Sequence, residues 1–269
     1  MSGNVMEALS LKGKVAIVTG SCQGLGLGMS SALAEAGADI VVTSRDQAKA
    51  VQEAQRLEEA HGVDALGLGM DLCDAESIRA MAQAAFGFKG QIDILVNNAY
   101  YFGASAPGDF LQREYQVFEQ LIKANLTGTM ECCRAVGKYM AERKSGKIIN
   151  ISSISGMVGR GKQLYRDNDM RETPVDYGVI KGGIIMLSQD LAAYFGAHGI
   201  CVNTISPGGY QNPRLTPGFT EGFSKLTALG RLGDPTFDLK GAVVLLASGA
   251  ANYITGQNLA VDGGFTSYK

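Results

Sequence analysis

Tyr177 and Lys181 form the residue pair of this chain best suited to acid–base chemistry. They lie four positions apart in an apolar segment that predicts a helix, so their side chains fall on one helix face. A free tyrosine has a pKa of about 10, too high for a base near neutral pH, but a nearby ammonium favours the phenolate. Tyr177 could then donate a proton to a ketone during reduction or accept one from an alcohol during oxidation. The same spacing also occurs on ordinary helix surfaces, so the pair needs support from its surroundings.

Two polar residues elsewhere in the chain could join this pair. The run 147–151 (KIINI) predicts a strand and is followed by two serines. Ser153 is expected to hold the substrate oxygen, because ligands of parallel sheets bind beyond the carboxyl ends of the strands. Asn125 lies within a long predicted helical region, 109–143, although asparagine is a poor helix former. Its amide either is satisfied by neighbouring groups of the protein or holds a water molecule that serves Lys181.

A glycine-rich turn, 19–26 (TGSCQGLG), follows the first predicted strand and precedes an alanine-rich predicted helix. Glycine lets the backbone turn tightly and approach a pyrophosphate, and the helix start offers free N–H groups to its negative charge. The alternative is a tight connection that binds no ligand. The position directly after a strand favours a dinucleotide site. Its expected members are Gly20, Ser21, Gln23, Gly24, Leu25 and Gly26.

The residues that follow the next two predicted strands bear on which dinucleotide is bound. Ser44 and Arg45 end the second strand. A carboxylate there would bind the ribose hydroxyls of NAD, whereas an arginine pairs with the 2′-phosphate of NADP. Arg45 therefore favours NADP(H), with NAD(H) and a merely solvated arginine as the alternatives. Asp71, followed by Leu72, is expected to accept a hydrogen bond from the adenine amino group, unless it only caps a helix or loop.

Strands and helices alternate along the whole chain, and this pattern must position the polar residues. It implies parallel strands joined by helical crossovers, with helices on both faces of the sheet. We therefore predict an α/β fold, a single doubly wound Rossmann-like domain at 11–269 that follows an N-terminal tail, 1–10. An insertion, 159–176, and a substrate loop, 207–226, interrupt the pattern and are expected to be functional. The predicted strands are 14–19, 39–43, 63–70, 92–96, 147–151, 200–205 and 258–261.

Composition argues against several classes of function. The 269 residues include 24 basic and 26 acidic side chains, so the chain lacks the positive charge that generic nucleic-acid binding requires. No apolar run approaches the roughly 20 residues needed to cross a bilayer, and the first ten residues lack the features of a secretory signal. Two histidines and five cysteines without a CxxC pair argue against a metal site and a disulfide framework. We therefore expect a cytoplasmic protein that acts on a small molecule without a metal.

The motifs and their order resemble the short-chain dehydrogenase/reductase family over residues 11–265. Eight segments carry the resemblance: TGSCQGLG (19–26), MDLCD (70–74), DILVNNA (93–99), KANLTG (123–128), IINISSISG (148–156), YGVIK (177–181), VNTISPGG (202–209) and ITGQNLAVDGG (254–264).

The resemblance implies a seven-stranded Rossmann-like fold, hydride transfer with a nicotinamide cofactor, and assembly as a homotetramer. The lysine of its catalytic tetrad is expected to bind the nicotinamide ribose as well. By position, the tetrad would be Asn125, Ser153, Tyr177 and Lys181. The further residues expected to line the cofactor are Asn98, Ala99, Pro207 and Gly208.

The chain departs from the family pattern in three places. Tyr100 replaces the glycine that usually follows the NNA motif, which places aromatic side chains beside the nicotinamide site. Positions 153 and 177 are 24 apart (177 − 153), about twice the usual spacing. Tyr165 falls nearer that spacing but has Asp169 where the lysine is needed, so we keep Tyr177 as the acid–base residue. The threonine expected after the PG motif is missing. The residues expected to contact substrate are Tyr100, Tyr101, Tyr165, Gly209 and Tyr210.

Three functions are compatible with these residues. The first is an oxidoreductase of secondary alcohols and ketones that acts on a polar or sugar-like substrate. Its polar character is suggested by four basic residues in the insertion: Arg160, Lys162, Arg166 and Arg171. The second is a 3-oxoacyl-thioester (acyl-carrier-protein) reductase, against which the bulky insertion argues. The third is a non-catalytic nucleotide-binding regulator, against which the complete tetrad argues.

Overall fold

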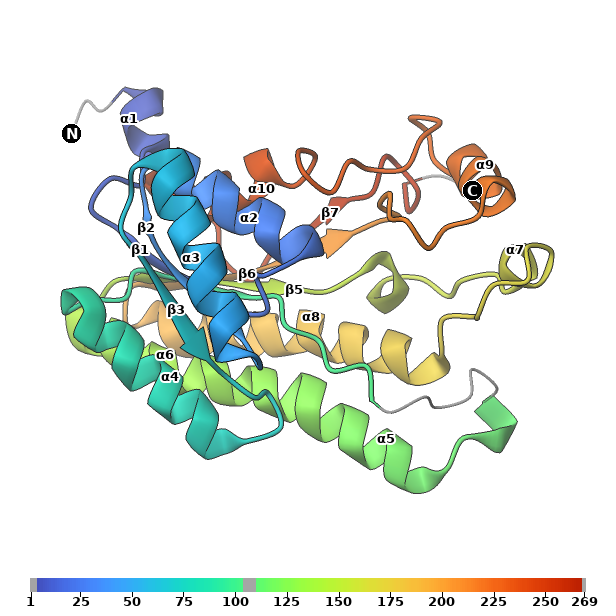
Figure 1. Ribbon diagram of the computed structural model, residues 1–269, viewed down its shortest axis with the longest axis horizontal. Helices are drawn as coiled ribbons and strands as arrows, with labels where there is room; N and C mark the ends of the chain where they lie inside the picture. Colours follow the sequence, from blue (N-terminus) through green and yellow to red (C-terminus); the bar gives the residue numbers. More distant parts are fainter. Residues whose placement is uncertain (1–3, 104–109, 268–269) are drawn as a thin grey trace.

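The computed structural model describes residues 4–103 and 110–267. Its centre is a seven-stranded sheet in the order β3-β2-β1-β4-β5-β6-β7, and every neighbouring pair is parallel (Figure 1). Each strand is connected to the next one in the chain through at least one helix, as parallel pairing requires. The predicted Rossmann-like α/β fold is confirmed. The strands are β1 (Val15–Val18), β2 (Asp39–Ser44), β3 (Ala65–Gly69), β4 (Ile94–Asn97), β5 (Gly146–Ile151), β6 (Ile200–Pro207) and β7 (Asn258–Val261).

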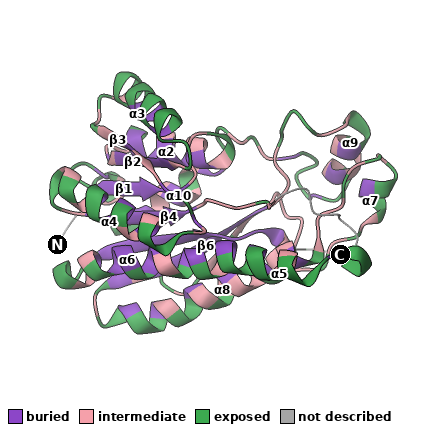
Figure 2. Cartoon of the chain, turned by 60° about the horizontal axis from the view of Figure 1, so that its bottom comes forward, coloured by how far each residue is buried: buried purple, intermediate pink, exposed green. Residues whose placement is uncertain are grey.

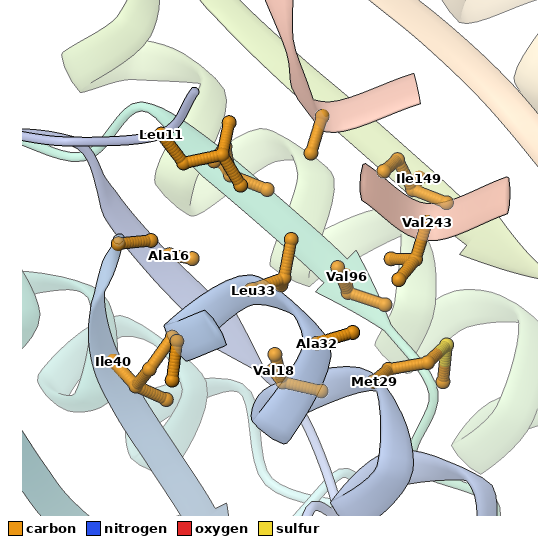
Figure 3. Close-up of a cluster of buried hydrophobic side chains, with 14 of the residues drawn as sticks. Leu11, Ala16, Val18, Met29, Ala32, Leu33, Ile40, Val96, Ile149 and Val243 are labelled. Atoms are coloured by element: carbon orange, nitrogen blue, oxygen red, sulfur yellow. The ribbon is translucent and has the colours of Figure 1, made fainter. Parts of the chain in front are cut away.

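Two hydrophobic cores lie on the two faces of this sheet. Ala16 and Val18 of β1 belong to one core and Val15 and Ile17 to the other, because successive side chains of a strand point to opposite faces. In Figure 3, side chains of one helix and Val243 cluster over the first face. That face is covered by α2 (Gly24–Glu35), α3 (Gln47–His61) and α10 (Lys240–Ala247). The second is covered by α4 (Ala75–Lys89), α6 (Gly128–Arg143) and α8 (Val175–Gly196).

The long helical region predicted at 109–143 is divided in the structure; its first residue lies outside the described residues. A short 3-10 turn, Phe110–Gln112, precedes α5 (Tyr115–Ile122), and a π-helical turn, Lys123–Thr127, separates α5 from α6. Asn125 lies in this wider turn. Such turns inside helices are frequent at functional sites.

The two segments that interrupt the predicted pattern each contain a short helix. These helices, α7 (Gln163–Arg166) and α9 (Pro217–Lys225), lie at the same end of the molecule (Figures 1 and 2). Their apolar side chains form a third hydrophobic cluster with Ile154. A third unexpected helix, α1 (Val5–Leu9), lies in the predicted tail. The insertion and the substrate loop therefore pack against each other.

The inner strands of the sheet are largely buried, the edge strands β3 and β7 are mostly half-buried, and the outer faces of the helices are exposed (Figure 2). Within the described ranges, no helix combines the length and apolarity needed to cross a bilayer. The same ranges contain no group of three histidine, cysteine or acidic side chains arranged to hold a metal ion.

Candidate active site

A cavity of about 570 Å³ opens at the carboxyl ends of the strands, where ligands of this sheet type bind. Residues from most of the predicted motifs meet in its wall. Those predicted from sequence are Gly20, Gln23, Gly24, Leu25, Gly26, Ser44, Arg45, Asp71, Leu72, Asn98, Ala99, Tyr100, Tyr101, Ser153, Tyr177, Lys181, Pro207 and Gly208. The structure does not bring Ser21, Asn125, Tyr165, Gly209 or Tyr210 into this wall.

The glycine turn is held against the end of β4. A Cβ on Gly26 would lie 2.4 Å from Nδ2 of Asn98, and Gly20 has a φ of 64° that side chains rarely adopt. Asn98 donates hydrogen bonds from Nδ2 to the carbonyls of Thr19 and Gly20, at 2.9 and 3.1 Å. Asn98 therefore fixes the turn, and the glycines leave its backbone open to the cavity.

The start of α2 is suited to a phosphate group. Gln23 at its N-cap makes no side-chain hydrogen bond to the helix, and no acidic residue lies in the first turn. By contrast, α3 and α4 are capped by the carboxylates of Asp46 and Asp74. An uncapped helix start presents its N–H groups and positive dipole end to an anion. The glycine turn and α2 together fit the pyrophosphate of a dinucleotide.

Two cations, Arg45 and Lys49, also line this cavity. The guanidinium carbon of Arg45 is 5.9 Å from the ring centre of Tyr101. Lys49 lines the same cavity, and its Nζ is 3.8 Å from the carboxylate of Asp46. Lys49 was not predicted from the sequence, where its signal was its place in the first turn of the helix after Arg45. Asp71 accepts a hydrogen bond from the Cys73 amide at 2.9 Å, so it shapes the loop at the cavity edge.

Tyr177 and Lys181 project from the first two turns of α8. Lys181 is 6% exposed, and its Nζ donates a 2.7 Å hydrogen bond to the carbonyl of Ile151. Burial lowers the pKa of Lys181 to about 8. Burial also raises the pKa of Tyr177, an effect that the hydrogen bond with Ser153 opposes. The expectation that Lys181 lowers the pKa of Tyr177 is not met, because Nζ lies 5.8 Å from the Tyr177 ring centre and burial dominates.

The two serines after β5 have different contacts. Ser152 donates a hydrogen bond of 2.6 Å to the carbonyl of Lys181, which ties α8 to β5. Ser153 accepts a hydrogen bond from the Ser155 amide and shares one with Tyr177. Gly156 lets the segment after β5 lie close to α8, since a Cβ there would lie 2.5 Å from the backbone of Lys181. Of the two serines, Ser153 therefore has the hydroxyl bonded to Tyr177.

Tyr100 forms an aromatic wall beside this group. Its ring centre lies 5.2 Å from that of Tyr177 and 4.9 Å from that of Phe102, both at steep angles. The ammonium of Lys181 lies 5.1 Å from the centre of the Tyr100 ring. Burial raises the pKa of Tyr100, so its hydroxyl stays protonated near neutral pH. The tyrosine at this position thus narrows the cavity next to the acid–base residues.

Asn125 forms hydrogen bonds with the backbone of Tyr101, in the middle of the aromatic segment 100–102. Its Oδ1 accepts from the Tyr101 amide at 2.6 Å, and its Nδ2 donates to the carbonyls of Tyr101 and Leu121. The amide is therefore satisfied by neighbouring backbone groups, one of the two alternatives that the sequence left open. A role in holding water for Lys181 stays a prediction.

The other predicted residues outside the cavity have contacts of their own. Ser21 is buried, and its hydroxyl donates to the carbonyl of Val18 at 2.8 Å. Tyr165 shares a 2.9 Å hydrogen bond with Thr173 and packs on Phe219 in the third cluster. Gly209 and Tyr210 line a separate cavity of about 100 Å³. None of these four residues lines the main cavity, and their roles in binding cofactor or substrate stay predictions.

A buried ion pair next to Tyr177 was not predicted. Arg113 and Asp176 lie 3.4 Å apart, and each side chain is 2% exposed. The pair connects the segment before α5 to the first turn of α8. Its only sequence signal was an aspartate beside Tyr177, which gave no indication of a partner 63 positions away (176 − 113).

Known proteins resemble this chain over nearly its whole length. The family model described as "Enoyl-(Acyl carrier protein) reductase" matches residues 20–266. A 3-oxoacyl-[acyl-carrier-protein] reductase of Aquifex aeolicus is 32% identical over 95% of this chain and 98% of its own length. Sorbose reductase of Candida albicans is 34% identical over 99% of this chain and 92% of its own length.

A solved structure gives the same result in three dimensions. The gluconate 5-dehydrogenase of Burkholderia cenocepacia, in complex with NADP and tartrate, superimposes with a TM-score of 0.88 at 33% identity. The match covers 99% of this chain and 100% of that one. These similar proteins are all named as reductases or dehydrogenases, but their names give different substrates: an acyl thioester, a neutral sugar and a sugar acid.

Proposed function

Because the chain belongs to the short-chain dehydrogenase/reductase family, it is an NAD(P)-dependent oxidoreductase of secondary alcohols and ketones, and we propose that its substrate is polar and sugar-like. The observation that carries the proposal is the group of Ser153, Tyr177 and Lys181 in the wall of the cavity that also contains the glycine turn. A polar substrate is supported by the insertion, which brings Arg160 against Tyr165 and Phe223 of the third cluster.

In the proposed mechanism, Tyr177 moves the proton. When a ketone is reduced, the Tyr177 hydroxyl donates its proton to the substrate oxygen, which Ser153 orients by a hydrogen bond. The nicotinamide cofactor supplies the hydride when bound. Lys181 is protonated below its pKa of about 8. Burial raises the pKa of Tyr177, whereas the hydrogen bond with Ser153 and the positive charge of Arg160 both lower it, and they stabilise the tyrosinate that remains. Oxidation of the alcohol reverses these steps.

Substitution of Tyr177 tests this mechanism. Tyr177→Phe should lower kcat for NADPH-dependent ketone reduction at least ~100-fold, the usual contribution of a general acid. Binding of NADPH, measured by fluorescence titration, should be retained. Tyr165→Phe is the matched control, because Tyr165 contacts Thr173 and Phe219 outside the cavity, and it should retain most of the activity. Undiminished activity in Tyr177→Phe would refute the assignment.

The proposed cofactor is NADP(H), bound with its 2′-phosphate at Arg45 and Lys49. Both cations line the cavity beside the glycine turn, and a phosphate contact of this kind contributes about 1.5–3 kcal/mol. Arg45→Ala and Lys49→Ala should each weaken NADPH binding roughly 10-fold or more and should change NADH binding little. Arg56→Ala, an exposed change on the same helix as Lys49, is the control. A wild-type protein that binds NADH more tightly than NADPH would contradict the proposal.

A 3-oxoacyl-thioester reductase is the second candidate, supported by the acyl-carrier-protein reductases among the similar proteins. A panel of ketones separates the candidates when NADPH oxidation is followed for keto sugars, keto acids and an acetoacetyl thioester. A preference for the thioester would replace the polar substrate proposed above. A protein that binds NADPH but reduces no ketone would instead support a non-catalytic regulator.

The proposal includes a homotetramer in the cytoplasm. A row of exposed apolar side chains along α8, at Val175, Val179, Met186 and Tyr194, supports subunit contacts on this helix. Five free cysteines fit a reducing compartment. We also propose that the main unit spans 11–269, with 159–176 and 207–226 forming the substrate side of the cavity.

A further inference from the structure

Arg160 is held in a fixed position by three separate elements. Its guanidinium carbon lies 5.4 Å from the ring centre of Tyr165 and 5.5 Å from that of Phe223, on α7 and α9. Its Nη1 donates a 3.3 Å hydrogen bond to the hydroxyl of Ser155, which follows β5. Two aromatic faces and a hydroxyl thus orient the guanidinium before any ligand arrives, which lowers the entropic cost of binding.

Among the described residues, no carboxylate forms an ion pair with the half-buried Arg160. Its side chain contacts the rings of Tyr165 and Phe223 and the hydroxyl of Ser155. The other basic residues of the insertion differ. Arg166 is paired with Glu172 at 2.7 Å, and Lys162 donates to the carbonyl of Thr173. Arg171 is exposed. Of the three arginines of the insertion, Arg160 alone is both oriented by its neighbours and without an acidic partner among the described residues.

Arg160 is outside the wall of the main cavity and is connected to Ser153 of that wall through Ser155. The Ser155 that accepts its hydrogen bond donates its own amide N–H to Oγ of Ser153 at 3.1 Å. The positive charge of Arg160 lowers the pKa of Tyr177, against the larger effect of burial, so it is felt at the phenol oxygen. We expect a substrate whose carbonyl oxygen contacts Ser153 and Tyr177 to extend its other end out of the cavity toward Arg160.

We propose that Arg160 binds a carboxylate of the substrate, so that this enzyme acts on sugar-derived hydroxy acids and keto acids in preference to neutral sugars. This inference rests on the proposed function and deepens it. Arginine suits the role because its planar fork forms two parallel hydrogen bonds with a carboxylate. The remaining N–H groups of Arg160, beyond the one that Ser155 accepts, are the donors for this contact.

A binding experiment tests the proposal without turnover. D-gluconate and D-glucitol share one carbon chain and configuration and differ only in a terminal carboxylate against a CH2OH group. Their binding to the NADPH-saturated protein is measured by calorimetry, since neither alcohol can be reduced. Wild type should bind gluconate about 30-fold or more tightly than glucitol, the effect expected for charge-assisted hydrogen bonds. Equal binding of both, or no measurable binding of gluconate, would overturn the proposal.

Variants show whether Arg160 is responsible. Arg160→Gln should abolish the preference for gluconate, and Arg160→Lys should restore part of it because the charge is kept without the fork. Arg171→Gln, an equal loss of charge at an exposed site of the same insertion, should keep the wild-type preference. A preference that survives in Arg160→Gln, or is lost equally in Arg171→Gln, would overturn the assignment. Thermal melting of each variant establishes that it is folded.

A kinetic comparison separates this inference from the proposed function. 5-Keto-D-gluconate and L-sorbose are the matching ketones, again identical except for the terminal carboxylate. The ratio of kcat/KM for acid over neutral sugar should be high in wild type and fall about 30-fold in Arg160→Gln, mainly through the KM of the acid. Reduction of sorbose alone would overturn the carboxylate site and leave the proposed function intact. No NADPH oxidation with either ketone or with the wider panel would refute the proposed function itself.

Discussion

At the scale of single residues, the candidate active site is a set of polar groups removed from water. Lys181 is an ammonium enclosed by the Ile151 carbonyl and the rings of Tyr100 and Tyr177. One hydrogen bond and two aromatic faces do not replace the hydration of a full charge, so burial lowers its pKa. The protein therefore holds a charge at a cost in stability, at the place where a tyrosinate would form during turnover.

This cost makes a prediction about pH. Lys181 has a pKa of 10.5 in the unfolded chain and about 8 in the folded protein. Between these values the unfolded state binds more protons, so the free energy of unfolding rises with pH. The penalty is complete below pH 8 and disappears as the pH approaches 10.5. Relative to Lys181→Met, wild type should gain about 2 kcal/mol between pH 7 and 10.

Urea unfolding of both proteins at several pH values measures this difference. Comparison of the two pH profiles removes the constant offset that arises when Lys181→Met leaves the Ile151 carbonyl without its donor. Parallel profiles would show that Lys181 does not carry a lowered pKa in the folded protein.

At the scale of elements, the sequence predicted the strands but did not predict the short helices. Runs such as 147–151 form buried strands because they are continuous and β-branched, and the structure places β5 at Gly146–Ile151. The helices α7 and α9 were missed, since short helices depend on tertiary contacts, here the packing of Tyr165 on Phe219. The π-helical turn at Asn125 was missed because the hydrophobic periodicity of a helix does not reveal the single residue that such a turn adds.

The residues of the candidate site were also only partly predicted from the sequence. Cavity residues within motifs, such as Gly26 and Tyr177, were identified because their spacing carries the chemistry. Lys49 and the pair Arg113–Asp176 were missed because only the folded chain brings them to their partners. The structure places Tyr210 in the wall of the second cavity, and a loop sequence does not tell which of two cavities a side chain lines.

The contact between α7 and α9 makes a prediction at this scale. Phe219 is 4% exposed and packs against Tyr165 and Phe223. Phe219→Ala should cost about 3 kcal/mol at this site, and the loss should appear as local opening because the third cluster is separate from the two sheet cores. Amide hydrogen exchange should therefore accelerate in α7 and α9 and stay unchanged in β1 and β4. The matched change at the 69% exposed Phe237 should affect neither helix.

Loosening of this contact should also affect the substrate. Arg160 rests on Tyr165 and Phe223, so a mobile α9 should raise the KM of the ketone and leave the affinity for NADPH unchanged. Unchanged exchange in both helices would mean that other contacts hold the insertion in place.

At the scale of the whole molecule, the carboxyl ends of the strands and the helices that cover the sheet serve different purposes. The carboxyl ends of the strands form the cavity, and the helices that bury the sheet also present an outer surface (Figure 2). Most of that surface is polar, but α8 carries the exposed apolar row named above, on the helix that also carries Tyr177. Burial of this row between subunits would hold α8 from outside while the strand β5 holds it from inside.

The proposed tetramer therefore makes a prediction for α8. Wild type should elute with the mass of four chains when size-exclusion chromatography is combined with light scattering. Met186 is 54% exposed, more than two turns beyond Tyr177, and Met186→Glu should place a charge in the apolar contact and yield smaller species. Val51→Glu is the control, because Val51 is 40% exposed on α3, across the sheet from α8. If Met186→Glu keeps the wild-type mass, α8 is not a subunit contact. If wild type is itself a monomer, the exposed row on α8 does not mediate assembly, and Tyr177 is positioned by the contacts within one chain alone.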